Sequence, residues 1–206
     1  MTPSFHGDEA HADAPKLKMD RTMWLLAYAF AAGWVIATAM AAQLLRLLEA
    51  AGATPSEALL AGMLVGPAQV AARLAEAVAL KRSHPLLSAR IAAAAHPAGV
   101  AALALGAGAI PVFVLLHGAG NGILTIARGT LPLAIFGPEN YAYRLGLIGA
   151  PSRIAQALAP LAIGLLIDPL GRAVVVVTAC LSLSALIAML VLKPRVEPLG
   201  AEAAAE

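Results

Sequence analysis

Six long apolar stretches dominate this sequence and decide what it can fold into. Each has at least the roughly 20 residues that an α-helix needs to cross the hydrocarbon core of a bilayer. The sixth, AVVVVTACLSLSALIAMLVL, contains no charged residue. The third is the weakest, because Arg90 near its start and His96-Pro97 inside it predict a kinked or shorter helix. The predicted spans are 22–46, 57–80, 87–108, 110–136, 143–167 and 172–192.

The composition excludes an ordinary soluble protein of this length. Hydrophobic residues make up 60% of the 206-residue chain, charged residues make up 13%, and the mean hydropathy is +0.81. A soluble domain of this size has too much surface for its volume to bury so large an apolar share. The net charge is only +2, without a dense run of Lys and Arg to bind nucleic-acid phosphates. We therefore expect an all-α membrane protein with six transmembrane helices and no nucleic-acid partner.

The two ends of the chain differ from the apolar middle. Residues 1–21 are first acidic and His-containing, then basic, which predicts a disordered N-terminal tail or the remnant of a linker. Residues 22–192 form the predicted transmembrane domain, and residues 193–206 form a predicted C-terminal tail. Ala39-Met40-Ala41 fits a signal-peptide cleavage site, but the apolar run before it is long for a signal peptide. A retained first helix is the favoured interpretation.

The distribution of Lys and Arg predicts the orientation in the membrane. If the N-terminal tail is inside, nine of the 14 basic residues fall in cytoplasmic segments and two fall outside. The remaining three lie within spans. Because cytoplasmic loops carry the excess of basic residues, both termini are expected in the cytoplasm.

Polar residues recur along one face of the second, fourth and fifth spans, at spacings of three and four. A charge inside the bilayer is costly, so such residues are expected to face the bundle interior or a water-filled cavity. The glycines of Gly62-xxx-Gly66 and Gly118-xxx-Gly122 would let neighbouring helices approach closely. The three sets are Gly62, Gly66, Gln69, Arg73 and Glu76, then Gly118, Asn121, Thr125, Arg128 and Pro132, then Gly149, Arg153, Gln156, Pro160 and Gly164.

Three arginines within these spans share one obvious carboxylate, Glu76. Arg153 lies within about 3 Å of the middle of its span, and Arg73 and Arg128 lie about 7–8 Å to the cytoplasmic side of theirs. The surplus positive charge predicts a bound anion, held by a bidentate guanidinium. We expect Arg153 to matter most in a substrate site whose other candidates are Gln156, Arg128, Asn121 and Gln69.

Structural interpretations of the same residues remain open. Arg73 and Glu76, at positions i and i+3, can form a gating or purely structural charge pair. Arg128 can extend to the cytoplasmic interface, and the three amide side chains can serve as hydrogen bonds between helices. Glu76 and His117 are candidates for proton coupling, although a lone histidine beside glycines is more often bonded to a neighbouring helix.

Two segments resemble a known transporter family. Residues 118–164, GAGNGILTIARGTLPLAIFGPENYAYRLGLIGAPSRIAQALAPLAIG, are similar to the tenth and eleventh helices of bacterial major facilitator superfamily transporters. GPAQVAARLAE, residues 66–76, followed by Lys81-Arg82, resembles the eighth helix and its basic loop, with Glu76 as the acid and the second glycine of the motif missing. A closer literal match, Gly164-x-x-x-Asp168-x-x-Gly171-Arg172, falls in a loop expected outside.

The resemblance covers about 22–192 and implies the C-terminal six-helix half of such a transporter, built from two inverted three-helix repeats. It implies alternating-access transport of a small solute across a bacterial inner (plasma) membrane. The expected partners are the lipid bilayer, the solute, and a second six-helix half or a second copy in a homodimer. A truncated gene product, a split half and a homodimeric unit remain alternatives. The competing function is a truncated or non-transporting membrane subunit without independent activity.

An enzyme is not expected from these residues. Ser152 is the only serine in a suggestive setting, and no histidine follows it in the chain to act as its base. Zinc-binding spacing is absent, and the single cysteine, Cys180, excludes an internal disulfide. No GxxxxGK[ST] phosphate loop is present either, so an ion or proton gradient is the expected energy source. We predict no catalytic residue, no metal and no cofactor.

Overall fold

The structure, a computed structural model, describes residues 17–80 and 83–193. Within these ranges the chain forms helices joined by short turns, with no strand. Residues 1–16 and 194–206 of the predicted tails, and the Lys81-Arg82 pair, lie outside the described residues. The helices are α1 (Arg21–Ala50), α2 (Pro55–Gly62), α3 (Val65–Ala79), α4 (Pro85–Leu103), α5 (Ile110–Phe136), α6 (Tyr141–Leu170) and α7 (Val174–Val191), with 3₁₀ turns η1 (Ala107–Ala109) and η2 (Gly171–Ala173).

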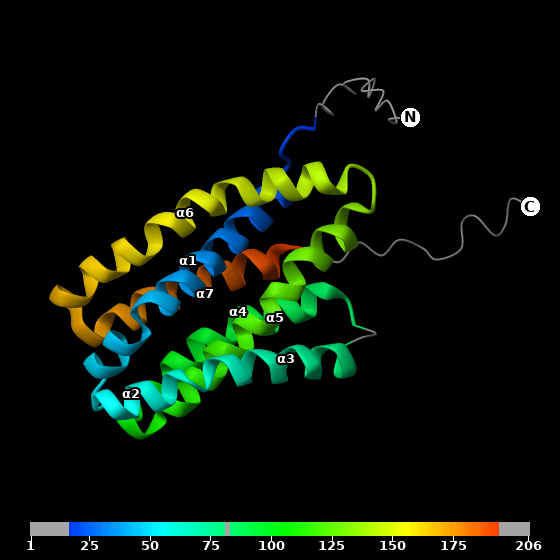
Figure 1. Cartoon of the computed structure of the whole chain (residues 1–206). Helices are drawn as coiled ribbons and strands as arrows, with labels where there is room; N and C mark the ends of the chain where they lie inside the picture. Colours follow the sequence, from blue (N-terminus) through cyan, green and yellow to red (C-terminus); the bar gives the residue numbers. More distant parts are fainter. Residues whose placement is uncertain (1–16, 81–82, 194–206) are drawn as a thin grey trace, which may run out of the picture.

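Five segments of the described chain are long and apolar enough to cross a membrane. The expected all-helical class is therefore confirmed, and the segments suggest a membrane-embedded protein. The last segment, Tyr141–Val191, has 51 residues and contains both α6 and α7. Figure 1 shows that the chain turns back after α6 and that α7 runs in the opposite direction. Length and composition therefore identify five segments able to span a membrane, whereas a sixth crossing would depend on this turn.

Capping residues mark several of the helix starts. Asp20 accepts a hydrogen bond from the backbone N–H of Met23 at 2.7 Å, at the start of α1. Thr54 and Glu57 form a reciprocal capping box at the start of α2, which also has Pro55 in its first turn. The Nδ1 atom of His84 accepts from the N–H of Leu86 at 3.1 Å at the start of α4. These side chains use backbone donors that a helix start leaves unpaired.

The second predicted span is interrupted in the structure. α2 ends at Gly62, and α3 begins at Val65 after a turn at Met63 and Leu64. Pro67 explains this break, because it has no N–H to bond the carbonyl of Met63, and its ring collides with that carbonyl in a continuous helix. The single helix expected over 57–80 is thus two shorter helices.

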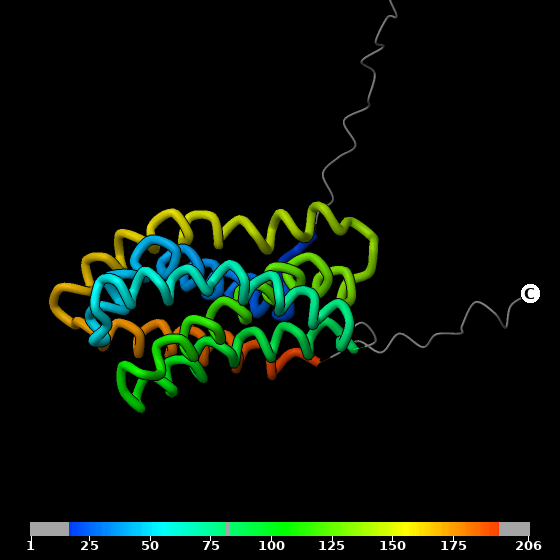
Figure 2. The backbone as a smooth tube through the Cα atoms, turned by 60° about the horizontal axis from the view of Figure 1, so that its bottom comes forward, coloured from blue at the N-terminus to red at the C-terminus, as the bar shows by residue number. Residues whose placement is uncertain are grey.

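The helices pack in the order α3, α5, α4, α7, α1, α6, with each in contact with the next. Figure 1 shows α6 and α3 at the two edges of this arrangement, with α1, α7, α4 and α5 between them. Figure 2 shows the same helices from another side, running along one long direction with the turns at both ends. The described chain starts and finishes at the same end of the bundle. Large exposed apolar side chains lie on the edge helices, namely Val70, Leu74 and Val78 of α3 and Ile154, Leu158, Leu161 and Leu165 of α6.

Glycines of α5 set the closest helix contacts. A Cβ atom added to Gly122 would lie 2.5 Å from the backbone oxygen of Gln69 on α3, and one on Gly118 would lie 2.9 Å from that of Val65. The expectation that Gly118-xxx-Gly122 lets helices approach is therefore confirmed. Gly66 has no atom within 4 Å of such a Cβ, so the Gly62-xxx-Gly66 pair is not a comparable contact.

Prolines inside helices leave backbone carbonyls without their usual partner, and at one of them a side chain of a neighbouring helix bonds the carbonyl. The interior prolines of the described helices are Pro97, Pro132, Pro151, Pro160 and Pro169. Pro97 runs within a continuous α4 and cannot donate to the carbonyl of Ala93. Ser182 of α7 donates its hydroxyl to that carbonyl at 2.8 Å. Pro160 likewise leaves the carbonyl of Gln156 on α6 without its helical N–H. The Thr38 hydroxyl of α1 lies 3.4 Å from this carbonyl but donates to the nearer carbonyl of Trp34, at 2.8 Å in its own helix. The bond from Ser182 repairs the loss at Ala93 and is stabilising in a bilayer core, where water cannot bond a free carbonyl.

Replacement of Ser182 by alanine should destabilise the protein by about 0.5–1.5 kcal/mol, because the buried carbonyl of Ala93 loses its partner. Restoring the backbone N–H with Pro97→Ala should make the same serine substitution nearly neutral. Unfolding of the four members of this cycle in mixed detergent micelles gives the coupling free energy. Equal effects of Ser182→Ala with and without Pro97 would contradict the repair.

Candidate functional site

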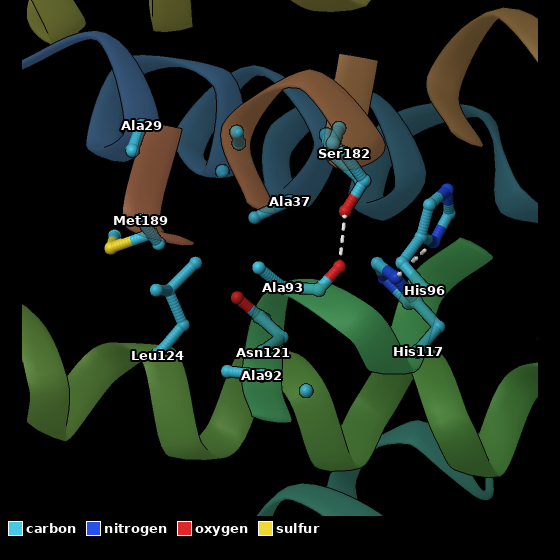
Figure 3. A pocket seen from close by; sticks show the side chains of 14 residues that line it. Ala29, Ala37, Ala92, Ala93, His96, His117, Asn121, Leu124, Ser182 and Met189 are labelled. Atoms are coloured by element: carbon cyan, nitrogen blue, oxygen red, sulfur yellow. Dashed lines mark hydrogen bonds between the residues drawn. The ribbon is translucent and has the colours of Figure 1, made fainter. Parts of the chain in front are cut away.

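A small cavity, reached by a few polar side chains and called the polar cavity below, lies between α1, α4, α5 and α7, near the middle of the helix row. Its volume is about 30 Å³, which is room for about one water molecule. Figure 3 shows Asn121 of α5 pointing into this space, with Ser182 of α7 above it and the two histidines at one end. The remaining lining is mostly alanine, glycine and aliphatic side chains. The polar groups are therefore gathered in an otherwise apolar interior.

His96 and His117 meet at one end of this cavity. Their Nδ1 atoms are 3.1 Å apart, and the two side chains are buried, with 4% and 5% of their surface exposed. The Nε2 atom of His96 lies 2.9 Å from the hydroxyl of Thr178 on α7. Phe113 packs against both rings, nearly parallel to that of His117. The prediction that a neighbouring helix bonds His117 is confirmed, and the partner is a second histidine.

Arg128 occupies the other side of the same interior. Only 8% of its surface is exposed, and its guanidinium carbon lies 3.8 Å from the centre of the Trp34 ring on α1. Gly33 leaves room for this stacking, since a Cβ there would be 3.2 Å from Nη2 of Arg128. Gly33 also lines the cavity that holds Asn121. Arg128 is thus directed into the bundle and does not extend to the interface.

The guanidinium of Arg128 has no hydrogen-bond partner among the described residues. Its Nε, Nη1 and Nη2 atoms are all buried and unbonded. The Trp34 ring supplies a cation–π contact but no acceptor. A buried, charged group without acceptors is strongly unfavourable, so this arrangement is suited to an anion that brings them.

Arg73 and Glu76 do not form the ion pair predicted from their spacing. Arg73 instead directs Nε toward the carbonyl of Gly122 on α5, at 3.4 Å. The only ion pair among the described residues joins Arg46 of α1 to Asp168 of α6 at 2.8 Å. One carboxylate oxygen of Glu76 is buried without a partner among the described residues, beside a cavity of about 230 Å³ between α3, α4 and α5. Arg73 does not pair with Glu76 because α5 is close enough to offer Arg73 a backbone acceptor.

The structure does not bring Arg153 to the polar cavity. Arg153 is exposed on α6, which lies at an edge of the helix row and packs mainly against α1. Gln156 is half-buried and meets α1 through its backbone carbonyl. Gln69 is half-buried on α3, where its backbone touches Gly122. Of the predicted substrate-binding residues, Asn121 and Arg128 are therefore the two that lie in the interior.

Sequence reasoning missed His96, Thr178 and Trp34 as members of this site. From the sequence, His96 is only a residue that weakens the third predicted span. One signal could have indicated a role for His96. It directly precedes Pro97, which leaves the carbonyl of Ala93 without its helical N–H, and a partner for that carbonyl brings α7 close. Trp34 follows Gly33 on the first span, but no pattern in the chain indicates that Arg128 lies opposite.

Comparison with known proteins leaves the family of this chain undetermined. No protein-family model matches the sequence, and no curated protein matches it at a significant level. The resemblance carried by residues 118–164 therefore stands on those residues alone. It enters below as a proposal, beside the geometry of the polar interior.

Arg128→Met should raise the free energy of unfolding by about 1–3 kcal/mol, because an apolar side chain of similar length removes an unpaired buried charge. Arg90 provides the matched control. It donates to the backbone oxygens of Met189, Leu190 and Leu192 at the end of α7, at 3.1, 3.4 and 2.8 Å.

Arg90→Met should therefore lower stability by a similar amount, since three carbonyls lose their donor. Thermal unfolding of both variants in lipid nanodiscs measures the contrast. A large loss of stability in Arg128→Met would show that the guanidinium has a structural partner.

Proposed function

We propose that this chain is a membrane transport protein, the C-terminal six-helix half of a major facilitator superfamily-type secondary transporter, and that it moves a small anionic solute by alternating access. The observation that carries the proposal is Arg128, a buried guanidinium next to an interhelical cavity, with no acceptor in the part of the chain that the structure describes. A residue that destabilises the apo protein in this way is typical of a binding site. The resemblance of residues 118–164 to the family supports the same function.

The packing pattern supports an inverted-repeat architecture. The first repeat would be α1, α2–α3 and α4, and the second α5, α6 and α7. The contact of α1 with α6 corresponds to that of α5 with α3, and the contact of α4 with α5 corresponds to that of α7 with α1. When the helices of the two repeats are exchanged, the remaining large contact, α4 with α7, becomes α7 with α4, which is the same pair. Two related three-helix units are expected to give a contact pattern that this exchange leaves unchanged.

The proposed substrate contact is a carboxylate or similar anion on Arg128. The Trp34 ring covers one face of the guanidinium and leaves its edges, where the N–H groups lie, for an acceptor. Two parallel N–H···O bonds would satisfy the buried donors and fix the anion's orientation. Asn121, about two helical turns away on α5, can bond a second polar group of the solute. The present cavity holds about one water, so binding requires a more open conformation.

A second six-helix unit is the proposed partner, either a separately encoded half or a second copy of this chain. Transporters of this type place the solute between two halves, and the described chain supplies one. The apolar side chains exposed on α3 and α6 offer surfaces for that unit or for lipid. The proposed location is the bacterial inner membrane, and the nine basic residues of the cytoplasmic segments support both termini inside.

The orientation can be tested separately from transport. Reporter fusions after residue 10 and residue 200 should both give a cytoplasmic signal, because six crossings return the chain to its starting side. Five crossings would place the two fusions on opposite sides. A periplasmic signal from one fusion would therefore contradict the six-helix proposal.

Trp34 offers a direct test of anion binding. The chain has two tryptophans, and Trp24→Phe leaves Trp34 as the only one, stacked on Arg128. In nanodiscs we expect acetate, lactate, succinate or phosphate to change its fluorescence, while succinamide does not. Arg128→Gln should weaken the binding of the responding anion about ten- to hundredfold, because hydrogen bonds to a charged group are lost.

Arg153→Gln is the matched control, since it removes an exposed arginine from the edge helix. It should leave the Trp34 response unchanged. If Arg153→Gln abolished binding and Arg128→Gln did not, the site would lie on α6, as the depth of Arg153 predicts from sequence. If no anion changed the fluorescence, the anion site would be rejected and the alternative of a subunit without independent activity would be favoured.

A further inference from the structure

The histidine pair is not explained by anion binding. His96 on α4 and His117 on α5 face each other through Nδ1 at 3.1 Å, and His96 continues through Nε2 to Thr178 at 2.9 Å. Thr178 in turn donates to the carbonyl of Val175 at 2.9 Å. This chain of hydrogen bonds is buried between three helices and adjoins the cavity that also reaches Gly33, beside Arg128.

Hydrogen-bond chemistry restricts how protons are arranged in this chain. A neutral imidazole carries one N–H and one lone pair. Two Nδ1 atoms in hydrogen-bond contact must therefore be one donor and one acceptor. When both rings are neutral, one of His96 and His117 holds its proton on Nδ1 and the other holds it on Nε2.

Either arrangement can accept one additional proton. If His117 donates from Nδ1, its Nε2 has a free lone pair, which takes the proton while every bond in the chain is kept. If His96 donates from Nδ1, its Nε2 first accepts from the Thr178 hydroxyl. On taking the proton, this Nε2 donates to the Thr178 oxygen, and the hydroxyl donates to Val175. A second proton would place two N–H groups face to face at 3.1 Å. The capacity of the pair is therefore one proton.

No carboxylate among the described residues faces the pair. The parts of α1 that line the cavity are apolar, and α7 contributes the hydroxyls of Thr178 and Ser182. The charged groups of the other packed helices are Arg90 on α4, bonded to the end of α7, and Arg128 on α5, about 16 Å along the helix from His117. On the far side of α5, α3 carries two charged residues. Arg73 is directed to the carbonyl of Gly122, and Glu76 lies beside a different cavity.

A proton on the pair would thus add positive charge to an interior that already holds Arg128. Positive charge in an apolar interior is costly unless an anion accompanies it. An anion bound to Arg128 would neutralise the charge of that residue, and across the low-dielectric interior it would also lower the cost of a proton on the pair. Proton and anion binding at these two places are then mutually favourable, and by linkage each strengthens the other.

We propose that His96 and His117 form a binding site for a single proton, which is taken up together with the anion at Arg128, so that the solute is transported with one proton. This inference rests on the proposed anion transport. It assigns the energy source to a specific pair of side chains, with the proton entering from water in the shared cavity. Glu76 lies outside this cavity and takes no part.

The first test needs no transported solute. Nitrogen-15 NMR of histidine-labelled protein in nanodiscs should show one of His96 and His117 as the Nδ1–H tautomer and the other as Nε2–H, with a scalar coupling between their Nδ1 nuclei. His96→Asn and His117→Gln assign the signals, and His84 at the start of α4 is the internal reference. Two Nε2–H tautomers without coupling would overturn the pair.

The second test measures proton uptake. Adding the anion that changes Trp34 fluorescence should take up one proton per chain from weakly buffered solution, read by a pH-sensitive dye. His117→Gln should abolish the uptake while Trp34 still responds, with the affinity lowered and no longer dependent on pH. His84→Asn should behave as the unmodified chain does.

The outcomes separate the two proposals. Anion binding without proton uptake would overturn the proton site and leave anion transport standing. Proton uptake that persists in His117→Gln would place the proton elsewhere and equally overturn the inference. The absence of any anion response would overturn the proposed function, and with it the coupled uptake.

Discussion

The bilayer leaves no water to bond a free backbone carbonyl, and prolines inside the helices create such carbonyls. At Ala93 the hydroxyl of Ser182 on α7 takes the place of the missing N–H. This bond fixes both the distance and the register of two helices. The contact of α4 with α7, and through it the meeting of His96 with Thr178, follows from the bond at Ala93. A proline within α4 thus helps to position the polar interior.

The sequence was sufficient to predict the helices because a membrane-spanning helix is recognised by its own length and hydropathy. The predicted spans agree with α1, α4, α5, α6 and α7 to within a few residues, with α4 ending at Leu103 before the expected 108. The break at Pro67 was not predicted, although the proline was visible. The close approach along Gly118 and Gly122 was predicted correctly from the small residues.

The arrangement of the site was less accessible from sequence. Depth along a helix can be counted, and this made Arg153 the favoured residue, whereas the face that meets a neighbour depends on packing. The structure places Arg153 on an edge helix and Arg128 in the interior against Trp34. The Arg73–Glu76 pair failed for the same reason, because Gly122 on α5 offers a nearer acceptor. The sequence around a residue contains no pattern that indicates which helix, far away in the chain, it will contact.

The histidine pair also joins parts of the two proposed repeats, since α4 belongs to the first and α5 and α7 to the second. A hydrogen bond tolerates only a few tenths of an ångström of sliding before it is lost. While the pair is intact, α4, α5 and α7 must therefore move as one rigid block. α1 packs along α7 of this block but touches α5 at few points, where Gly33 and Trp34 meet Arg128. The interior would then open along the seam between α1 and α5, which is also where the guanidinium lies.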